Sequence, residues 1–247
     1  MPALNEENDI HDAIQNVIES YKKLSLNGEI IIVNDGSTDA TKRISESLVS
    51  QHSNIHLINH RKSEGIGKSY WDGVKASKGE CVTWVPADGE NDAYEILRYL
   101  SLMDHVDIIV PYVYNKETRS RKRRLLSKTY KAIINLSFGM ILNYMNGTVI
   151  FRRSILEEIN LRSGGFFFTT ELLIKTIKKG YLYAEVPCGL NRRASGQSKA
   201  LSLRSLYKVI TGYTGMLFSV YFSGNKKTNL YNGSMTFKRK KIMNVKN

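Results

Sequence analysis

The sequence predicts an α/β protein with a mainly parallel, mixed sheet flanked by helices. Short apolar runs rich in β-branched residues alternate with segments of helical periodicity over about 190 residues, the order expected of strand–helix–strand units. The most apolar run, residues 30–33, is too short for a helix and is typical of a strand buried on both faces. Asp35 and Gly36 follow it directly, as polar turn residues do where a parallel strand leads into a helix.

The composition is that of a globular protein with an excess of positive charge. The chain has 247 residues, of which 42% are hydrophobic and 24% charged, so it can bury a full core. Its 36 Lys and Arg residues against 23 Asp and Glu residues give a net charge of +13. This charge favours an anionic partner, which is a nucleic acid, a phosphorylated ligand or a membrane surface. Residues 115–131 hold eight of the cations against Glu117 alone, and residues 238–241 form a second cluster.

Cysteine usage and hydropathy indicate a cytosolic protein. Cys81 and Cys188 form neither a disulfide framework nor a zinc site, and no signal peptide is recognisable, so the reducing cytosol is the expected setting. No stretch reaches the roughly 20 apolar residues that a membrane-spanning helix needs. The nearest candidates, residues 132–145 and 209–222, are interrupted by polar residues and are expected to be buried or interfacial helices.

The first part of the chain predicts alternating helices and strands. Pro2 prevents a regular helix at the start, and Asn8 or Asp9 can cap the helix after it. The turn after the first buried strand lets Gly36 adopt a positive φ. The expected elements are a helix at 10–21, a strand at 29–33, a helix at 39–50 capped by Ser37 or Asp39, and a strand at 55–58.

A glycine-rich turn at residues 64–69 precedes the next helix. Its Gly67-Lys68-Ser69 has the order found at the end of a phosphate-binding loop, but the first glycine of that spacing would have to stand at Lys62. We therefore do not assign a P-loop here.

The rest of the chain continues the pattern and ends in a helix and a basic tail. The expected elements are strands at 81–85, 107–111, 147–153 and 183–186, and helices at 93–102, 125–143, after Ser154, and from Thr169 or Thr170 to Lys179. Residues 203–217 carry one apolar stripe, which can pack on the core or lie at a membrane interface. We divide the chain into a domain at 1–200, an amphipathic helix at 201–222 and a basic tail at 223–247 that we expect to be disordered.

Acidic residues stand at the ends of predicted strands and the starts of predicted helices. Asp35 follows the first buried strand, a place where open α/β sheets bind nucleotides. Asp88 and Glu90 lie two residues apart in an irregular turn, so both can reach a hard divalent cation through oxygen. The alternative is that these two acids only cap the helix that begins near Ala93. Glu171 is a further candidate, at the start of a helix.

An ordered set of motifs runs along most of the chain. It consists of residues 2–7 (PALNEE), 33–39 (VNDGSTD), 65–69 with Gly73, 87–91 (ADGEN), the basic segment ending at Ser127, Gly147 with Arg152-Arg153, 170–172 (TEL) and 193–199 (RASGQSK). Together these motifs resemble those of the inverting family 2 glycosyltransferases, whose GT-A fold is a single Rossmann-like domain. Within that family the chain looks like the polyprenyl-phosphate branch, which is similar to dolichol-phosphate mannose synthase.

The resemblance implies transfer of a sugar from a nucleoside-diphosphate sugar to a polyprenyl (dolichyl or undecaprenyl) phosphate, with inversion. The UDP- or GDP-linked sugar would be bound by residues of the first four motifs, namely Pro2, Ala3, Asn5, Glu7, Asp35, Gly67, Lys68 and Asp88. Asp88 and Glu90 would hold Mg²⁺ or Mn²⁺ on the diphosphate, where the cation neutralises the leaving group.

The resemblance also implies an acceptor site at the cytosolic face of a membrane, on which the protein would be peripheral. The acceptor phosphate would be bound by Arg121, Arg124, Ser127, Arg193, Ser198 and Lys199. The implied catalytic residues are Glu171, Asp88 and Arg193. A phosphate acceptor is largely ionised at neutral pH because its second pKa is about 6, so Glu171 would orient it; for a hydroxyl acceptor Glu171 would be the base. Each Lys or Arg near an anionic leaflet contributes about 1 kcal/mol to membrane binding.

The chain departs from the family pattern in three places. Pro86 stands where the first Asp of the D-x-D motif is expected, so a metal would rest on Asp88, Glu90, phosphate and water. Asn143 stands where the branch usually has an Asp. No strand is recognisable ahead of Pro2, so we expect the first strand to be missing and the neighbouring strand edge to be exposed.

Three other functions stay open. One is transfer to a saccharide hydroxyl in glycan synthesis. Another is a non-catalytic nucleotide-sugar- or membrane-binding relative, which the departures at Pro86 and Asn143 would mark. The last, nucleic-acid binding, rests on charge alone without a recognisable module, so we expect no nucleic-acid partner. Metal-dependent transfer from a nucleotide sugar separates the enzymes from the rest.

Overall fold

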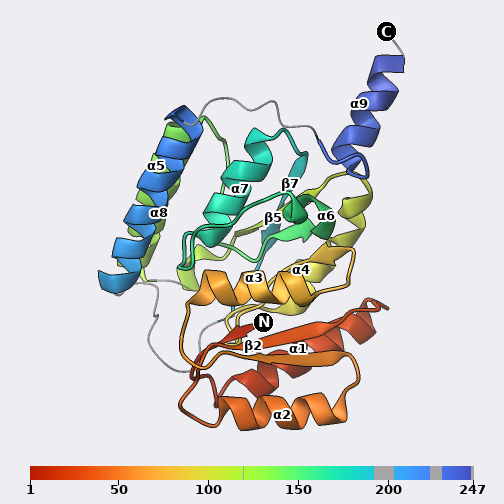
Figure 1. Cartoon of the computed structure of the whole chain (residues 1–247), viewed down its shortest axis with the longest axis vertical. Coiled ribbons are helices and arrows are strands. Elements are labelled where there is room, and N and C mark those ends of the chain that lie inside the picture. Colours follow the sequence, from red (N-terminus) through yellow and green to blue (C-terminus); the bar gives the residue numbers. More distant parts are fainter. Residues whose placement is uncertain (119, 192–202, 223–229, 246–247) are drawn as a thin grey trace.

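Two sheets surrounded by helices make up the protein, as a computed structural model describes it for residues 1–118, 120–191, 203–222 and 230–245 (Figure 1). The strands are β1 (Pro2–Ala3), β2 (Ile30–Asn34), β3 (Ile55–Asn59), β4 (Cys81–Val82), β5 (Ile108–Val113), β6 (Ile150–Arg152) and β7 (Tyr183–Cys188). The α-helices are α1 (Ile10–Lys23), α2 (Thr41–Gln51), α3 (Ile66–Ala76), α4 (Ala93–Leu97), α5 (Arg121–Phe138), α6 (Arg153–Glu157), α7 (Phe168–Lys178), α8 (Leu203–Phe222) and α9 (Met235–Val245). Two short 3-10 helices are η1 (Leu100–Asp104) and η2 (Lys116–Thr118).

The two sheets differ in strand direction. In the first sheet, β1, β2 and β3 are parallel, with Val33 of β2 between Pro2 and Ile58. The second sheet has the order β4-β6-β5-β7, in which β5 and β7 are parallel and β6 is antiparallel to both neighbours. The predicted strands at 81–85 and 147–153 are shorter in the structure, and the predicted helix at 93–102 divides into α4 and η1.

The core of the first sheet extends into the second. Ile32 of β2 is fully buried because apolar side chains cover both faces of the strand. Ile10 and Ile14 of α1 belong to the same apolar cluster as Ile109 of β5 and Ile150 of β6. The two sheets therefore share this apolar cluster, which supports the polar residues at the carboxyl ends of β1 and β2.

A two-residue strand lies beside β2, where we expected the first strand to be missing. Pro2 and Ala3 pair with Val33 and Asn34, and the backbone N of Asp35 donates to the Ala3 carbonyl oxygen at 2.8 Å. The expectation is corrected to this extent: β1 occupies the place next to the carboxyl end of β2. It thereby brings the first sequence motif beside Asp35.

The helix α5 begins earlier than predicted and contains most of the basic segment. The Ser120 hydroxyl accepts a hydrogen bond from the Arg123 backbone N at 3.4 Å, which caps the first turn. The helix ends at Gly139, whose φ of 57° lies in the left-handed region that favours glycine. Because the segment is helical, its cations point in different directions around the axis.

Part of the predicted disordered tail is ordered and contains the helix α9 (Met235–Val245), so that prediction is wrong for residues 230–245. The fully buried carboxylate of Asp107 accepts hydrogen bonds from the backbone N of Met235 at 2.8 Å and of Thr236 at 2.9 Å, at the start of α9. Arg152 Nε donates to the same carboxylate at 3.2 Å. Composition could not indicate this helix, because its cap lies 128 residues earlier in the chain.

The helix α8 packs along α5 at one side of the molecule (Figure 1). The hydroxyl oxygens of Tyr213 and Ser137 lie 2.8 Å apart, and Met216 belongs to the larger core cluster. Ile210 and Phe222 are exposed on another side of α8. Both interpretations of this helix thus have support, because one face packs on the core and a second apolar face is exposed. Within the described ranges, no helix is long and apolar enough to cross a membrane.

Candidate functional site

A cavity of about 630 Å³ lies where several sequence motifs meet. Its lining comes from β1, the end of β2, the 63–69 turn, the 84–91 loop, one face of α5, the segments 144–148 and 164–169, and the start of α8. Parallel strands end at the same edge of a sheet, which is why motifs far apart in the sequence meet here. The predicted site residues that line it are Pro2, Ala3, Asp35, Asp88, Glu90 and Ser127.

The turn with Asp88 and Glu90 is held by its own backbone and by β7. The Glu90 backbone N donates to Asp88 Oδ1 at 3.2 Å, and Gly89 between them has a φ of 68°. The Asn91 and Leu190 backbones form a bridge that ties the turn to the end of β7. The cap of α4 is Asp92, whose carboxylate accepts from the Tyr94 backbone N at 3.0 Å. The capping interpretation therefore applies to Asp92, whereas Asp88 and Glu90 face the cavity.

The donor set of this turn fits a hard cation only if a ligand completes the coordination. Asp88 and Glu90 supply carboxylate oxygens, which Mg²⁺ and Mn²⁺ prefer, and Pro86 beside them supplies no side-chain ligand. In the part of the chain that the structure describes, no group of three or more His, Cys, Asp or Glu side chains could hold a metal. A cation here would therefore also need phosphate oxygens or water.

Asp35 is buried at the end of β2 and organises the turn before α3. Its Oδ1 accepts from His60 Nδ1 at 2.8 Å and from the Glu64 backbone N at 2.9 Å. Its Oδ2 accepts from Ser63 Oγ at 2.8 Å and from the Gly65 backbone N at 2.9 Å. Burial alone raises the pKa of Asp35, but these hydrogen bonds outweigh burial and lower it below the ordinary value. Asp35 is thus ionised at neutral pH and fixes His60 and residues 63–65 of the turn.

Asn5 and Glu7 support the loop after β2. Asn5 Oδ1 accepts from the Thr38 backbone N at 2.8 Å, and Glu7 Oε2 accepts from the Ala40 backbone N at 2.8 Å. In the described part of the cavity lining, Leu4 and Glu6 take part but Asn5 and Glu7 do not. The first motif therefore contributes some of its residues to the cavity and others to the loop.

Gly67 and Lys68 likewise lie beside the cavity, since the described lining includes Ser69 but neither of them. A Cβ atom at Gly67 would lie 2.2 Å from the Ser163 carbonyl oxygen, so only glycine lets α3 approach this backbone. The Gly67 backbone N donates to the Gly164 carbonyl oxygen at 3.0 Å. Lys68 forms an ion pair with Asp72 on the same helix.

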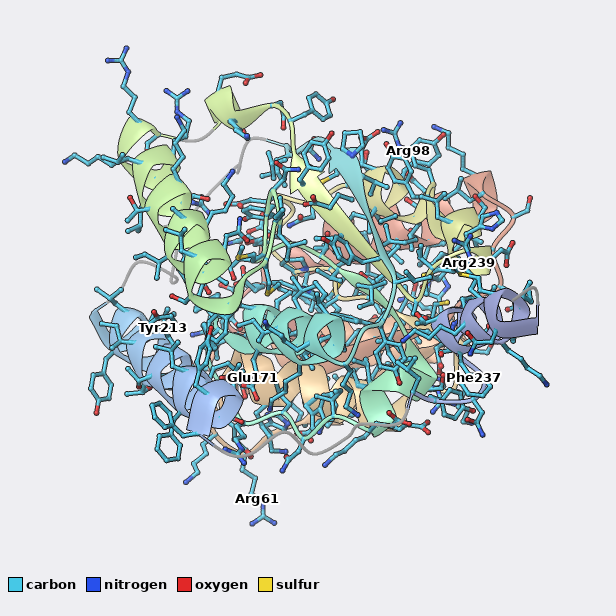
Figure 2. The ribbon with its side chains drawn as sticks, turned by 90° about the horizontal axis from the view of Figure 1, so that it is seen from above. Arg61, Arg98, Glu171, Tyr213, Phe237 and Arg239 are labelled. Carbon is cyan, nitrogen blue, oxygen red and sulfur yellow. The ribbon has the colours of Figure 1, made fainter. Side chains whose placement is uncertain are left out.

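Glu171 is buried on α7 and holds the loop before that helix (Figure 2). Its carboxylate accepts from the backbone N of Arg162 at 3.0 Å and of Ser163 at 2.8 Å, and pairs with Lys175. Burial alone raises its pKa, but the contacts with Lys175, Ser163 and Arg162 outweigh burial and lower the pKa. As far as the structure describes the lining, Gly164 of this loop takes part and Glu171 does not.

One face of α5 lines the cavity and includes cations that the sequence did not single out. Arg123, Ser127 and Lys131 lie four residues apart along this face, and Arg123 Nη1 lies 3.6 Å from Glu90 Oε1. Arg121 and Arg124 lie outside the described lining, because their positions on the helix turn them away. The signal that could have found Arg123 is its i, i+4 spacing to Ser127, given a helix that starts at Arg121.

Two polar groups in the lining were also missed. The Tyr130 hydroxyl and the Thr170 hydroxyl lie 2.8 Å apart, and the Thr170 hydroxyl donates to Asn146 Oδ1 at 2.8 Å. Tyr130 and Asn146 line the cavity. No local pattern indicates this network, because its members come from three separate segments.

The remaining predicted positions lie elsewhere. Arg193, Ser198 and Lys199 fall outside the described residues. Asn143, one of the departures, donates through its side chain to Glu185 on β7 at 3.1 Å. Pro86, another of the departures, lines the cavity beside Asp88.

Comparison with known proteins decides the family. The family model described as "Glycosyl transferase family 2" matches residues 1–160. The chain belongs to glycosyl transferase family 2. The predicted enzyme class, a glycosyltransferase, is thereby confirmed at the level of the family.

Two relatives in the family agree with the predicted branch. A polyprenol monophosphomannose synthase from Mycolicibacterium smegmatis is 29% identical over 183 residues, which cover 69% of this chain and 69% of that protein. A dolichyl-phosphate beta-glucosyltransferase from Trichomonas vaginalis is 34% identical over 94 residues, which cover 36% of this chain and 29% of that protein.

Solved structures confirm the predicted GT-A fold. Glucosyl-3-phosphoglycerate synthase from Mycobacterium tuberculosis in complex with UDP matches with a TM-score of 0.65 and 21% identity, over 87% of this chain and 78% of that chain. The same synthase in complex with Mn²⁺, UDP-glucose and phosphoglyceric acid has a TM-score of 0.65 and 21% identity, over 87% of this chain and 77% of that chain.

Proposed function

We propose that the protein transfers a sugar from a UDP- or GDP-linked donor to a polyprenyl phosphate, with inversion at the anomeric carbon. The observation that carries this proposal is the composition of the cavity lining. On one side of the cavity, residues at the strand ends and turns of the first sheet meet the turn that holds Asp88 and Glu90. On the other side, α5 and α8 contribute both cationic and apolar residues. The two helices contribute the cations Arg123, Lys131 and Lys208 together with the apolar side chains of Leu126, Leu206 and Val209. A phosphate on an isoprenoid chain needs this pairing of positive charge and apolar surface.

Asp88 and Glu90 would hold Mg²⁺ or Mn²⁺ on the donor diphosphate. When bound, the cation would supply positive charge to the departing nucleoside diphosphate. Asp35 acts through the 63–65 turn, which its hydrogen bonds keep in place beside the donor. The solved synthase with Mn²⁺ and UDP-glucose supports such a donor for this fold.

The acceptor phosphate would need no strong base in this cavity. A phosphate monoester is largely a dianion at neutral pH because its second pKa is about 6. One of its oxygens forms the new bond to the anomeric carbon, while the electron pair of the broken C–O bond leaves with the nucleoside diphosphate. Arg123, which lies 3.6 Å from Glu90, is placed to bind that oxygen or its neighbours. Because no base is needed, this chemistry is compatible with a Glu171 that only supports the 162–165 loop.

The membrane surface that brings the lipid phosphate would lie against α5 and α8. Exposed apolar side chains on this side include Leu136 and Phe222, which are 84% and 74% exposed. The exposed cations of α5, such as Lys122, would meet the anionic headgroups of the cytosolic leaflet. We therefore propose peripheral attachment at the cytosolic face.

The test is transfer of labelled sugar from UDP-glucose and GDP-mannose to undecaprenyl or dolichyl phosphate in vesicles, with and without Mn²⁺. We expect metal-dependent, chloroform-soluble product, and a loss of about 100-fold or more with Asp88→Asn, the scale of removing one group that stabilises the leaving charge. Asp12→Asn on α1, whose side chain is 90% exposed, is the matched control and should keep full activity. Transfer to a saccharide but not to either lipid phosphate would contradict the proposed acceptor.

A further inference from the structure

A buried histidine joins two carboxylates behind the lining of the cavity. His60 follows β3 directly, and its side chain is 7% exposed. Its Nδ1 lies 2.8 Å from Asp35 Oδ1, and its Nε2 lies 3.2 Å from Oδ2 of Asp72 on α3. The carboxylates are themselves shielded, with 5% of the Asp35 side chain and 18% of the Asp72 side chain exposed. None of these contacts was singled out from the sequence.

The two contacts determine how many protons the ring carries. Neutral imidazole has a single N–H, and an ionised carboxylate can only accept, so both contacts are hydrogen bonds only when both ring nitrogens are protonated. The lowered pKa of Asp35 keeps it ionised, and Asp72 forms an ion pair with Lys68. Glu64 also lies within 4.0 Å of Lys68. Three carboxylates thus surround one lysine and the ring, and a positive charge on His60 brings the cluster closer to balance.

The histidine is connected to the cavity through Asp35. Each oxygen of that carboxylate accepts two hydrogen bonds, so the four acceptor positions are filled by His60, Ser63 and the backbone of Glu64 and Gly65. Asp35, Ser63 and Gly65 line the cavity. Gly65 has a φ of 103°, so the turn depends on these hydrogen bonds to keep an uncommon backbone shape. A change at His60 therefore alters the cavity lining through Asp35 and the 63–65 turn, although His60 itself does not contact a ligand.

We propose that His60 is a positioning residue for the nucleotide of the donor: doubly protonated, it links Asp35 to Asp72 and keeps the 63–65 turn in the shape that binds the nucleotide. A ring with a single N–H would turn one of the two hydrogen bonds into a contact between two acceptors. The Asp35 carboxylate then loses a partner, or α3 loses its tie to β3. Nucleotide binding weakens as a result. This inference rests on the proposed function for the identity of the ligand.

The first test reads the ring itself and needs no ligand. In protein labelled with ¹⁵N-histidine, the two ring nitrogens of His60 should both show imidazolium shifts at pH 6 to 7, with protons that exchange slowly because the ring is buried. His60→Gln assigns the signals. A ring with one bare nitrogen in the folded protein at pH 6 would overturn the proposal.

The second test removes the two contacts one at a time. The amide of His60→Asn can replace the Nδ1 donor to Asp35, and that of His60→Gln can replace the Nε2 donor to Asp72. The readout is the Kd of UDP or GDP, measured by calorimetry. Each variant should bind the nucleotide about 10- to 100-fold more weakly than the wild-type protein, since one hydrogen bond to a charged group is lost. The value of kcat at saturating donor should change much less than the KM.

The matched control is His56→Gln, because His56 lies on β3 and its exposed ring is 3.8 Å from Glu29. It should leave the Kd of the nucleotide unchanged. Folded His60 variants that bind nucleotide as tightly as the wild-type protein would overturn the positioning role. If the wild-type protein bound no nucleotide while its ring carried both protons, the donor of the proposed function would fail, and the bridge between Asp35 and Asp72 would stand.

Discussion

The buried carboxylate of Glu171 accepts two backbone hydrogen bonds and forms an ion pair with Lys175. Removal of its charge is therefore expected to lower the stability of the fold. Glu171→Gln keeps the shape, removes the charge that pairs with Lys175 and leaves one backbone N–H without an acceptor. We expect the free energy of unfolding to fall by about 2–4 kcal/mol, with kcat little changed, because the group supports a loop. Urea unfolding and steady-state kinetics measure the two effects.

The same variant should show a distinct dependence on acid. The folded-state pKa of Glu171 is lower than its ordinary value of 4.5, so the carboxylate stabilises the fold above that pH and loses this contribution as the pH falls through the folded value. The wild-type unfolding free energy should therefore fall below about pH 4.5 more steeply than that of Glu171→Gln. Glu157→Gln removes an exposed partner of Arg153 and is the control. A loss of kcat at unchanged stability would instead make Glu171 part of the chemistry.

Single residues show where sequence reasoning succeeds and where it stops. The spacing of Asp35, Asp88 and Glu90 placed them just after predicted strands, and all three line the cavity. The donors to Asp35 come from a turn about 30 residues away, and those to Glu171 come from the loop before its helix. Such tertiary contacts decide whether an acidic residue faces a ligand or supports a loop. The spacing of residues in the sequence does not indicate these contacts.

At the scale of elements, two glycines of α3 make a matched pair. At Gly67 an added Cβ would lie 2.2 Å from the Ser163 carbonyl oxygen and 3.0 Å from Phe168 Cβ, so α3 or the 163–164 loop has to move. We expect Gly67→Ala to lower the free energy of unfolding by about 1–3 kcal/mol through overpacking. It should also weaken nucleotide binding, because Gly164 and Gly165 line the cavity. Urea unfolding and calorimetric nucleotide titration provide the two measurements.

Gly73→Ala is the control on the same helix. Its added Cβ would be 3.5 Å from Val33 Cγ2, an ordinary contact, and alanine favours a helix by up to about 1 kcal/mol over glycine. The stability should stay equal or rise, with nucleotide binding unchanged. Equal losses in both variants would mean that α3 is sensitive to any substitution and that its approach to the 163–164 loop is not the cause.

Helices and strands were predictable where the sequence of the segment itself shows the pattern of a helix or a strand. The apolar run of β2 and the helical periodicity of α1 and α7 are local, and the structure has these elements close to the predicted bounds. The antiparallel direction of β6 was not predictable, since its pairing with Ile108 and Ile109 is set by the path of the whole chain. The helix α9 was not predicted for a similar reason, because the residue that caps it, the buried Asp107, is distant in the sequence.

At the scale of the molecule, the cavity lies between the edge of the first sheet and the pair α5 and α8. The apolar side chains exposed on that pair lie on the same two helices that supply Arg123 and Lys208 to the cavity. A lipid phosphate that arrives along these helices would meet the cations before the donor. The arrangement thus connects the proposed membrane surface with the proposed chemistry.

This connection predicts that membrane binding and lipid transfer fall together. The double variant Leu136→Asp with Phe222→Asp removes two exposed apolar groups and adds two negative charges to this side. Because inserting each such side chain contributes about 1.5–3 kcal/mol, we expect binding to anionic vesicles to weaken more than 100-fold. Sedimentation with vesicles measures binding, and calorimetry should find the Kd of the nucleotide unchanged.

Ile242→Asp with Met243→Asp is the matched control, with the same number of charges at exposed apolar residues of α9. Figure 2 shows Arg239 on α9 at the opposite side of the molecule from Tyr213 on α8. If α5 and α8 face the membrane, the control should keep nearly all vesicle binding, because its charges lie far from the lipid. Equal losses in the two double variants would show that total charge governs binding, and the lipid phosphate would then have to reach Arg123 by another route.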